Sequence, residues 1–162
     1  MRRIFILVFT ILIFAACSLI NKATSEPAII IETATLKNCI ELTAQQIVAE
    51  NWISEFMQVK NERPTIITSR LINNTSAILA TDTIYASLDH ELAKTGQLRV
   101  IQSTPGQRLL NPIELSKATN IDFVLSIAIQ PNTANKKQAD VELSLWNSKS
   151  TTPLLIKRNT IE

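Results

Sequence analysis

The sequence has few of the residues that carry out chemistry in enzymes. Its 162 residues include one histidine, two glycines and two cysteines. Two glycines exclude a collagen-like chain and disfavour a glycine-rich loop around a phosphate group. Two cysteines exclude a disulfide-dense scaffold, and one histidine leaves too few ligands for a typical metal cluster. The composition therefore shows no obvious active site.

The rest of the composition is that of a folded domain. Hydrophobic residues make up 46% of the chain and charged residues 19%, which is too apolar for a disordered protein. A length of 162 residues corresponds to one domain. The apolar residues are unevenly distributed, however, and their concentration at the amino terminus indicates a separate segment there.

This amino-terminal segment has the pattern of a secretory signal. Arg2 and Arg3 precede an apolar run over residues 4–16, in which only Thr10 is polar. A membrane-spanning helix needs about 20 apolar residues, so the run is too short to span a bilayer. It has the length of the apolar core of a signal peptide behind a basic start.

The end of this segment resembles a bacterial lipobox. Small residues precede a cysteine in the run Phe14-Ala15-Ala16-Cys17, although Phe14 stands where leucine is usual. This resemblance implies cleavage after residue 16 and acylation of Cys17. A single acyl chain binds a membrane only marginally, whereas the three chains of a lipoprotein hold it stably. Ser18, in place of aspartate, implies delivery to the outer membrane, facing the periplasm. The alternative is an uncleaved anchor or a cut elsewhere, with Cys17 incidental.

Removal of the signal changes the charge of the protein. Without Arg2 and Arg3, Lys and Arg number 14, which equals the number of Asp and Glu. A neutral chain lacks the basic excess that nucleic-acid binding requires, so we expect no nucleic-acid partner. We divide the chain into a signal peptide over residues 1–16, a short tether over 17–40 and a domain over 41–162.

The domain is predicted to begin with a helix. Thr43 and Gln46 have the spacing of a capping box, in which each side chain bonds the other residue's backbone. Apolar residues then recur with helical spacing over 49–57, which predicts one buried face. Pro64 follows the end of this helix.

The remaining pattern predicts an α/β domain with a mixed β-sheet packed with helices. A helix capped by Thr81 or Asp82 is expected to end at Gly96, and a short helix to begin at an Asn111 cap. The predicted strands cover residues 65–72, 98–101, 121–129, 141–145 and 154–161.

The sequence contains two possible catalytic pairs. A cysteine nucleophile needs a base, and Cys39 and His90 are the candidates that the sequence offers. We favour a buried Cys39 and a solvated His90. Asp82 and Asp89 lie two helical turns apart, but we assign the first to capping and the second to a solvated face. We therefore expect no enzyme activity.

Several segments together resemble the penicillin-binding protein activator LpoB family. They are Arg63-Pro64 before the strand 66–72, the loop Asn73-Asn74-Thr75-Ser76, the helix start Thr81-Asp82-Thr83, and Gly96 before the strand 98–101. The later strand at Asp122 and the hairpin arm 141–146 also look like that family. The similarity covers roughly residues 42–162. It implies a fold similar to the amino-terminal domain of TolB.

The resemblance implies an outer-membrane lipoprotein that binds a bifunctional, class A penicillin-binding protein and stimulates peptidoglycan synthesis allosterically. It requires no cofactor, catalytic residue or small-molecule substrate. The candidate partner-binding residues are Arg70, Asn73, Asn74 and Thr75. The alternative role of this loop is to fix the turn between the strand and the helix.

One feature departs from that family. Its best-known members have a long Pro-rich spacer, whereas this chain has a short tether, so a synthase would have to extend outward to be reached. The alternative function is a structural subunit of an outer-membrane assembly, of the curli-secretion-like or flagellar-associated lipoprotein kind.

Overall fold

The computed structural model describes residues 30–135 and 137–161. In chain order its elements are α2 (Thr33–Val48), α3 (Trp52–Lys60), β1 (Thr65–Asn73), α4 (Thr81–Lys94), β2 (Arg99–Ile101), the 3-10 turn η1 (Gln107–Leu109), α5 (Pro112–Ala118), β3 (Phe123–Pro131), β4 (Ala139–Asn147) and β5 (Leu155–Ile161). The expected signal peptide, residues 1–16, and Cys17 lie outside the described residues.

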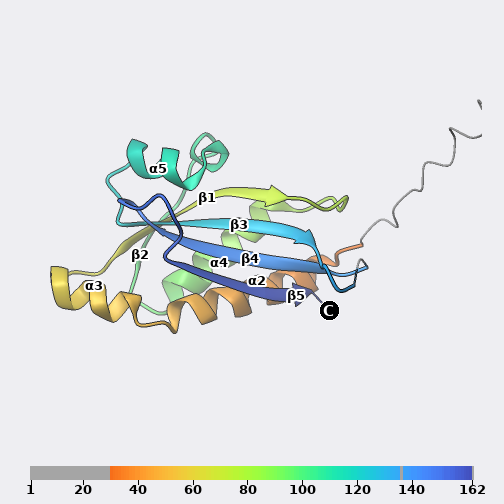
Figure 1. Ribbon diagram of the computed structural model, residues 1–162, viewed down its shortest axis with the longest axis horizontal. Coiled ribbons are helices and arrows are strands. Elements are labelled where there is room, and N and C mark those ends of the chain that lie inside the picture. Colours follow the sequence, from red (N-terminus) through yellow and green to blue (C-terminus); the bar gives the residue numbers. More distant parts are fainter. Residues whose placement is uncertain (1–29, 136, 162) are drawn as a thin grey trace, which may run out of the picture.

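Five strands form one mixed sheet in the order β2-β1-β3-β4-β5 (Figure 1). β1 runs parallel to both β2 and β3, whereas β3, β4 and β5 form an antiparallel meander. The chain passes from β1 through α4 to β2, which confirms the helix predicted between the strands over 65–72 and 98–101. The predicted α/β class and mixed sheet are confirmed as well.

The central strand β3 is covered on both faces where it begins. Phe123 and Leu125 point into the main core, and Val124 points to the other side, where it packs with α5. All three side chains are buried, which is typical of a strand between two layers. This part of β3 is therefore the centre of the fold.

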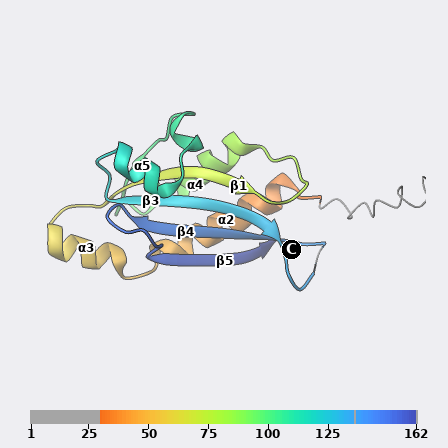
Figure 2. The ribbon, with the colours of Figure 1, turned by 45° about the horizontal axis from the view of Figure 1, so that its top comes forward.

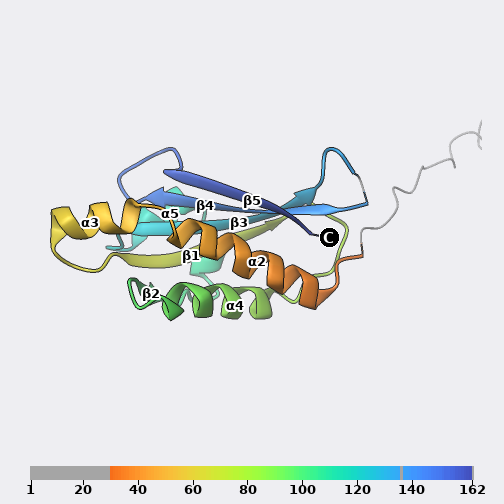
Figure 3. The ribbon, with the colours of Figure 1, turned by 90° about the horizontal axis from the view of Figure 1, so that it is seen from below.

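The main core lies between the sheet and the two helices α2 and α4, which cross the same face (Figure 3). Its fully buried side chains include Ile40 and Ile47 of α2, Leu88 and Leu92 of α4, and Ile66, Leu125, Leu143 and Leu145 of the sheet. Burying each of these side chains contributes about 1.5–3 kcal/mol, so this layer supplies most of the driving force for folding.

The opposite face of the sheet is only partly covered. There α5 packs Leu115 against Ile67 of β1 and Val124 of β3 (Figure 2). The same face of β4 and β5 carries Trp146, which is half-buried, and Ile156, which is 49% exposed. This arrangement leaves part of the outer face open beside α5.

Local signals predicted two helix ends correctly. Asn111 accepts a hydrogen bond from the backbone of Glu114 at 2.9 Å, and the Glu114 carboxylate accepts one from the backbone of Asn111 at 3.1 Å. Gly96 has a φ of 65°, the left-handed conformation that favours glycine after a helix. The predicted cap of α4 is wrong, because Ala80 occupies that position and Asp82 instead bonds Arg108 at 3.0 Å.

The first predicted helix is also corrected. Thr43 lies inside α2 rather than at its start, and its hydroxyl donates to the backbone oxygen of Cys39 at 2.6 Å. The helical stretch expected from Thr43 onward is split, because α2 ends at Val48 and α3 begins at Trp52. Ala49, predicted to be buried, is exposed in this break.

The boundary between tether and domain moves as a consequence. Residues 33–40, which the sequence assigns to the tether, form the first two turns of α2. Leu36, Cys39 and Ile40 from this stretch are buried in the main core. The folded domain therefore starts before residue 41, since removing these side chains from the core would expose the face of the sheet beneath them.

Candidate partner-binding surface

Arg70 lies on β1 beside the open part of the outer sheet face. The pairing of β1 with β3 shifts between Thr68 and Leu71, and the backbone N–H of Arg70 bonds Leu110 instead, at 3.4 Å. The Arg70 side chain is exposed. Among residues 30–135 and 137–161, no ion pair includes it. Its guanidinium is therefore available to an outside acidic group.

A hollow of about 500 Å³ adjoins Arg70. It is lined by Arg70, Ile72, Asn111, Pro112, Ile113, Glu114, Ser126 and Trp146. The indole N–H of Trp146 donates to the Ser126 hydroxyl at 3.1 Å, which fixes the ring. A fixed aromatic ring next to an arginine is a typical composition for a protein-binding surface, because both residue types are enriched at energetic centres of interfaces.

Polar side chains in this hollow are already used within the fold. Asn111 and Glu114 bond each other's backbone at the start of α5. Arg70 is therefore the charged side chain in the hollow that the fold does not employ. A guanidinium with free N–H groups binds a carboxylate through two parallel hydrogen bonds, so the hollow is suited to an acidic group next to an apolar one.

In the loop after β1, two of the four predicted contact residues bond to the loop itself. Asn73 donates to the backbone oxygen of Ala77 at 2.8 Å and accepts from Thr75, at 3.0 Å from the backbone and 2.7 Å from the hydroxyl. The Thr75 hydroxyl in turn accepts from the Ala77 backbone at 3.3 Å. These bonds support the alternative role, fixation of the turn, for Asn73 and Thr75.

Asn74 has a different position in the loop. Its backbone N–H bonds Ile129 of β3 at 2.7 Å, and its side chain is exposed. Neither Asn74 nor its neighbours Asn73 and Thr75 line the hollow that contains Arg70. The structure therefore does not bring the four predicted residues into a single hollow.

Trp146 and Ser126 complete the hollow but were not predicted. A sequence signal for Trp146 exists, since the buried residues Leu143 and Leu145 alternate with it along β4 and so place it on the opposite face. Ser126 has no comparable signal, because its role depends on its pairing with Ser144 and on the nearby indole.

The candidate catalytic pairs are not assembled. Cys39 is buried, and burial raises the pKa of its thiol, which disfavours a thiolate. His90 is exposed on α4, as predicted. The described part of the chain contains no hydrogen bond between the two, and no group of three or more His, Cys, Asp or Glu that could hold a metal ion.

Asp89 is buried rather than solvated, contrary to the prediction. It is 9% exposed and accepts a hydrogen bond from the Thr68 hydroxyl at 3.1 Å. Burial raises its pKa above the ordinary value of 3.8, although the bond from Thr68 and the charge of Arg108 act against this rise. Asp82 is far more exposed and bonds Arg108. These two carboxylates therefore have separate structural partners.

Comparison with known proteins identifies the family. The model of the family described as peptidoglycan-synthase activator LpoB matches residues 35–122. The chain belongs to the LpoB family. The match includes the segments from Arg63 to Ile101 that carry the resemblance seen in the sequence. Members of this family are activators of a synthase rather than the catalyst itself.

Solved LpoB structures share the fold. The C-terminal domain of LpoB from Escherichia coli matches with a TM-score of 0.59 and 10% identity, over 78% of this chain and 97% of that one. The corresponding domain from Salmonella enterica gives a TM-score of 0.50 and 11% identity, with the same coverage. The NMR structure of E. coli LpoB gives 0.51 and 12%, over 86% of this chain and 73% of that one.

Two further searches give negative results, one among known proteins and one among the helices of the structure. A search of curated proteins yields no match to this chain. Within residues 30–135 and 137–161, no helix has the length and apolar character that crossing a membrane requires.

Proposed function

We propose that this protein is a lipoprotein, anchored in the outer membrane through Cys17, that binds a class A penicillin-binding protein in the periplasm and activates peptidoglycan synthesis. The observation that carries the proposal is the LpoB family match over residues 35–122. The lipobox-like sequence before Cys17 supports the anchor. In this proposal the protein has no catalytic residues, no cofactor, no nucleic-acid partner and no small-molecule substrate.

Activation by such a protein is a shift between states of the synthase. A ligand that binds the active state more tightly than the idle state increases the active fraction, and only this difference in affinity matters. A tenfold shift in the ratio of the two states requires a difference of about 1.4 kcal/mol in binding free energy. One well-placed ion pair or one aromatic contact at an interface provides energy on this scale.

The hollow beside Arg70 is the contact surface that we assign to this activity. Its guanidinium is exposed and forms no ion pair with the described residues, and Trp146 beside it is held by Ser126. Asn74 contributes an exposed amide at the end of the same strand. Asn73 and Thr75 act indirectly, by holding the loop in the shape that presents Asn74.

A binding measurement tests the proposal. The full chain in detergent is titrated against a purified class A synthase from the same bacterium, and the Arg70→Glu variant is compared with the wild type. We expect the wild type to bind and the variant to bind about tenfold or more weakly, since a repulsive charge replaces an attractive one at the interface.

Lys137→Glu provides the control, because it makes the same change of charge at an exposed residue in the turn between β3 and β4. This variant should bind like the wild type. Absence of binding by the wild type at micromolar concentration would contradict the proposed function. Equal weakening by both variants would show that net charge, rather than the hollow beside Arg70, determines the affinity.

A further inference from the structure

A second hollow lies at the α3 end of the domain. It is formed where α3 approaches the start of β3 and the turn between β4 and β5, and it has a volume of about 380 Å³. We call it the aromatic pocket and define it by Trp52, Phe56, Val59, Phe123 and Leu154. It is distinct from the hollow beside Arg70, since the two share no lining residue.

The floor of the aromatic pocket is held rigidly. The ring of Phe123 lies 4.7 Å from that of Trp52 and 5.4 Å from that of Phe56, in tilted and edge-to-face arrangements. The indole N–H of Trp52 donates to the backbone oxygen of Ile47 at 2.8 Å. An interlocked floor of this kind does not have to rearrange to receive a partner, which lowers the cost of binding.

The mouth of the aromatic pocket is apolar and exposed. Val59 of α3 is 81% exposed, and Leu154, just before β5, is 53% exposed. Exposed single apolar side chains are common on proteins, but here two of them border a hollow with an aromatic floor. This combination fits a large apolar side chain from another molecule.

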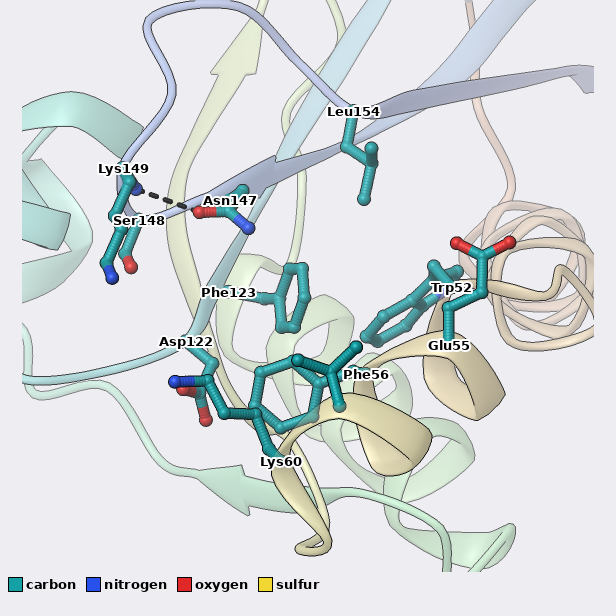
Figure 4. Close-up of a pocket in the computed structure, with 11 residues that line it drawn as sticks. Trp52, Glu55, Phe56, Lys60, Asp122, Phe123, Asn147, Ser148, Lys149 and Leu154 are labelled. Atoms are coloured by element: carbon teal, nitrogen blue, oxygen red, sulfur yellow. Dashed lines mark hydrogen bonds between the residues drawn. The ribbon is translucent and has the colours of Figure 1, made fainter.

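Charged residues surround the aromatic pocket unevenly. The amino groups of Lys60 and Lys149 lie on one side of the three rings, and the carboxylate of Glu55 lies on the other (Figure 4). Neither lysine takes part in an ion pair within the described ranges. The carboxylate of Asp122, which also borders the pocket, already accepts two hydrogen bonds from Thr65.

The position of the aromatic pocket favours a partner that approaches from the far side of the domain. The described chain begins at Ile30, and α3 lies at the opposite end of the longest axis (Figure 1). The chain from Cys17 to Ile30 advances by 13 residue steps, so it spans at most about 45 Å. With a lipid anchor at Cys17, the α3 end is the part of the domain that can extend furthest from the membrane.

We propose that the aromatic pocket is a docking site for a segment of the synthase in which a large apolar side chain stands next to an acidic residue. The apolar side chain would contact Phe56, Val59 and Leu154, above the buried rings of Trp52 and Phe123. The carboxylate would face Lys60 and Lys149. This inference rests on the proposed function. It adds a contact at the end of the domain that a synthase extending from the inner membrane meets first.

The test compares variants of exposed residues in the full chain in detergent, titrated against the purified class A synthase. Val59→Glu should weaken binding about tenfold or more, because it places a carboxylate at an apolar contact. The matched control is Ile78→Glu, since Ile78 is 100% exposed in the loop before α4 and lies outside the pocket. It should bind like the wild type, and circular dichroism should show both variants folded.

A second variant tests the charges. Lys60→Glu combined with Lys149→Glu should weaken binding and reduce its dependence on salt, because two attractive charges become repulsive. If Val59→Glu binds with unchanged affinity while Arg70→Glu still binds more weakly, the aromatic pocket is not a docking site for the synthase. That result would leave the proposed function intact. An effect of Val59→Glu on self-association alone would also overturn the docking site. Absence of binding by the wild type would contradict both proposals.

Discussion

Replacing Trp52 by Phe should destabilise the domain by about 2–3 kcal/mol, since it removes both a hydrogen bond and buried area. The indole N–H of Trp52 bonds the backbone oxygen of Ile47 at 2.8 Å, at the break between α2 and α3. The backbone N–H of Glu50 also bonds this oxygen, but at the longer distance of 3.4 Å. The phenyl ring cannot donate, so the carbonyl loses its main partner.

The magnitude follows from two contributions. Loss of the hydrogen bond costs about 1–1.5 kcal/mol, and more if the carbonyl finds no water. Trp52 is 7% exposed, and a phenyl ring covers about 40 Å² less apolar area, which adds about 1 kcal/mol. Both contributions act in the folded state, so the midpoint of urea unfolding should fall while its slope stays unchanged.

The second tryptophan of the chain provides the matched control. Trp146 is half-buried and bonds the Ser126 hydroxyl at 3.1 Å, where water can replace it. Trp146→Phe should therefore cost about 1 kcal/mol or less. Urea unfolding followed by circular dichroism measures both variants. If Trp52→Phe costs no more than Trp146→Phe, the assigned role of the indole at the helix break is wrong.

Three further predictions concern other parts of the protein. Burial raises the pKa of Asp89, so ionising this carboxyl lowers the free energy of unfolding as pH rises from 3.8 through the higher pKa of the folded protein. Asp89→Asn should remove this loss. Unfolding measured at both pH values should therefore show the variant more stable than the wild type at pH 7 but not at pH 3. Asn111→Ala removes the bond to Glu114 and should cost about 1 kcal/mol in urea unfolding, whereas Asn111→Asp, which can still cap, should cost less. Cys17→Ala should release the protein from the outer-membrane fraction, and continued retention there would refute the lipid anchor.

The parts of the fold that were predicted correctly depend on local signals. Asn111 and Glu114 are three residues apart and form their box without help from the rest of the chain. The alternation of Leu143 and Leu145 with polar neighbours predicted the strand over 141–145 in the same way. In both cases the residues that fix the structure are close in sequence.

The start of the domain was missed because a local pattern competed with a longer one. Thr43 and Gln46 have the spacing of a capping box, yet in the structure Asn159 of β5 donates to both side chains, at 2.9 and 3.0 Å. Leu36 and Ile40 continue the helical spacing of Ala44 and Ile47 back across Thr43. That periodicity was the signal for the longer helix.

The binding surfaces could be predicted only in part. Arg70 was named from its place in a family-like segment, but the hollow beside it also needs Trp146 of β4 and Pro112 of α5. The aromatic pocket joins α3, the start of β3 and the turn after β4, three segments that only the folded chain brings together. No periodicity in any one segment indicates such a hollow.

The initial rate of glycan polymerisation by a purified class A synthase, measured with increasing amounts of the full chain in detergent, tests the central claim most directly. The account predicts a saturable rise of about fivefold or more, within the usual range of coupling between two sites. Arg70→Glu should require a higher concentration for half of that rise. A rate that stays unchanged when binding is saturated would contradict activation.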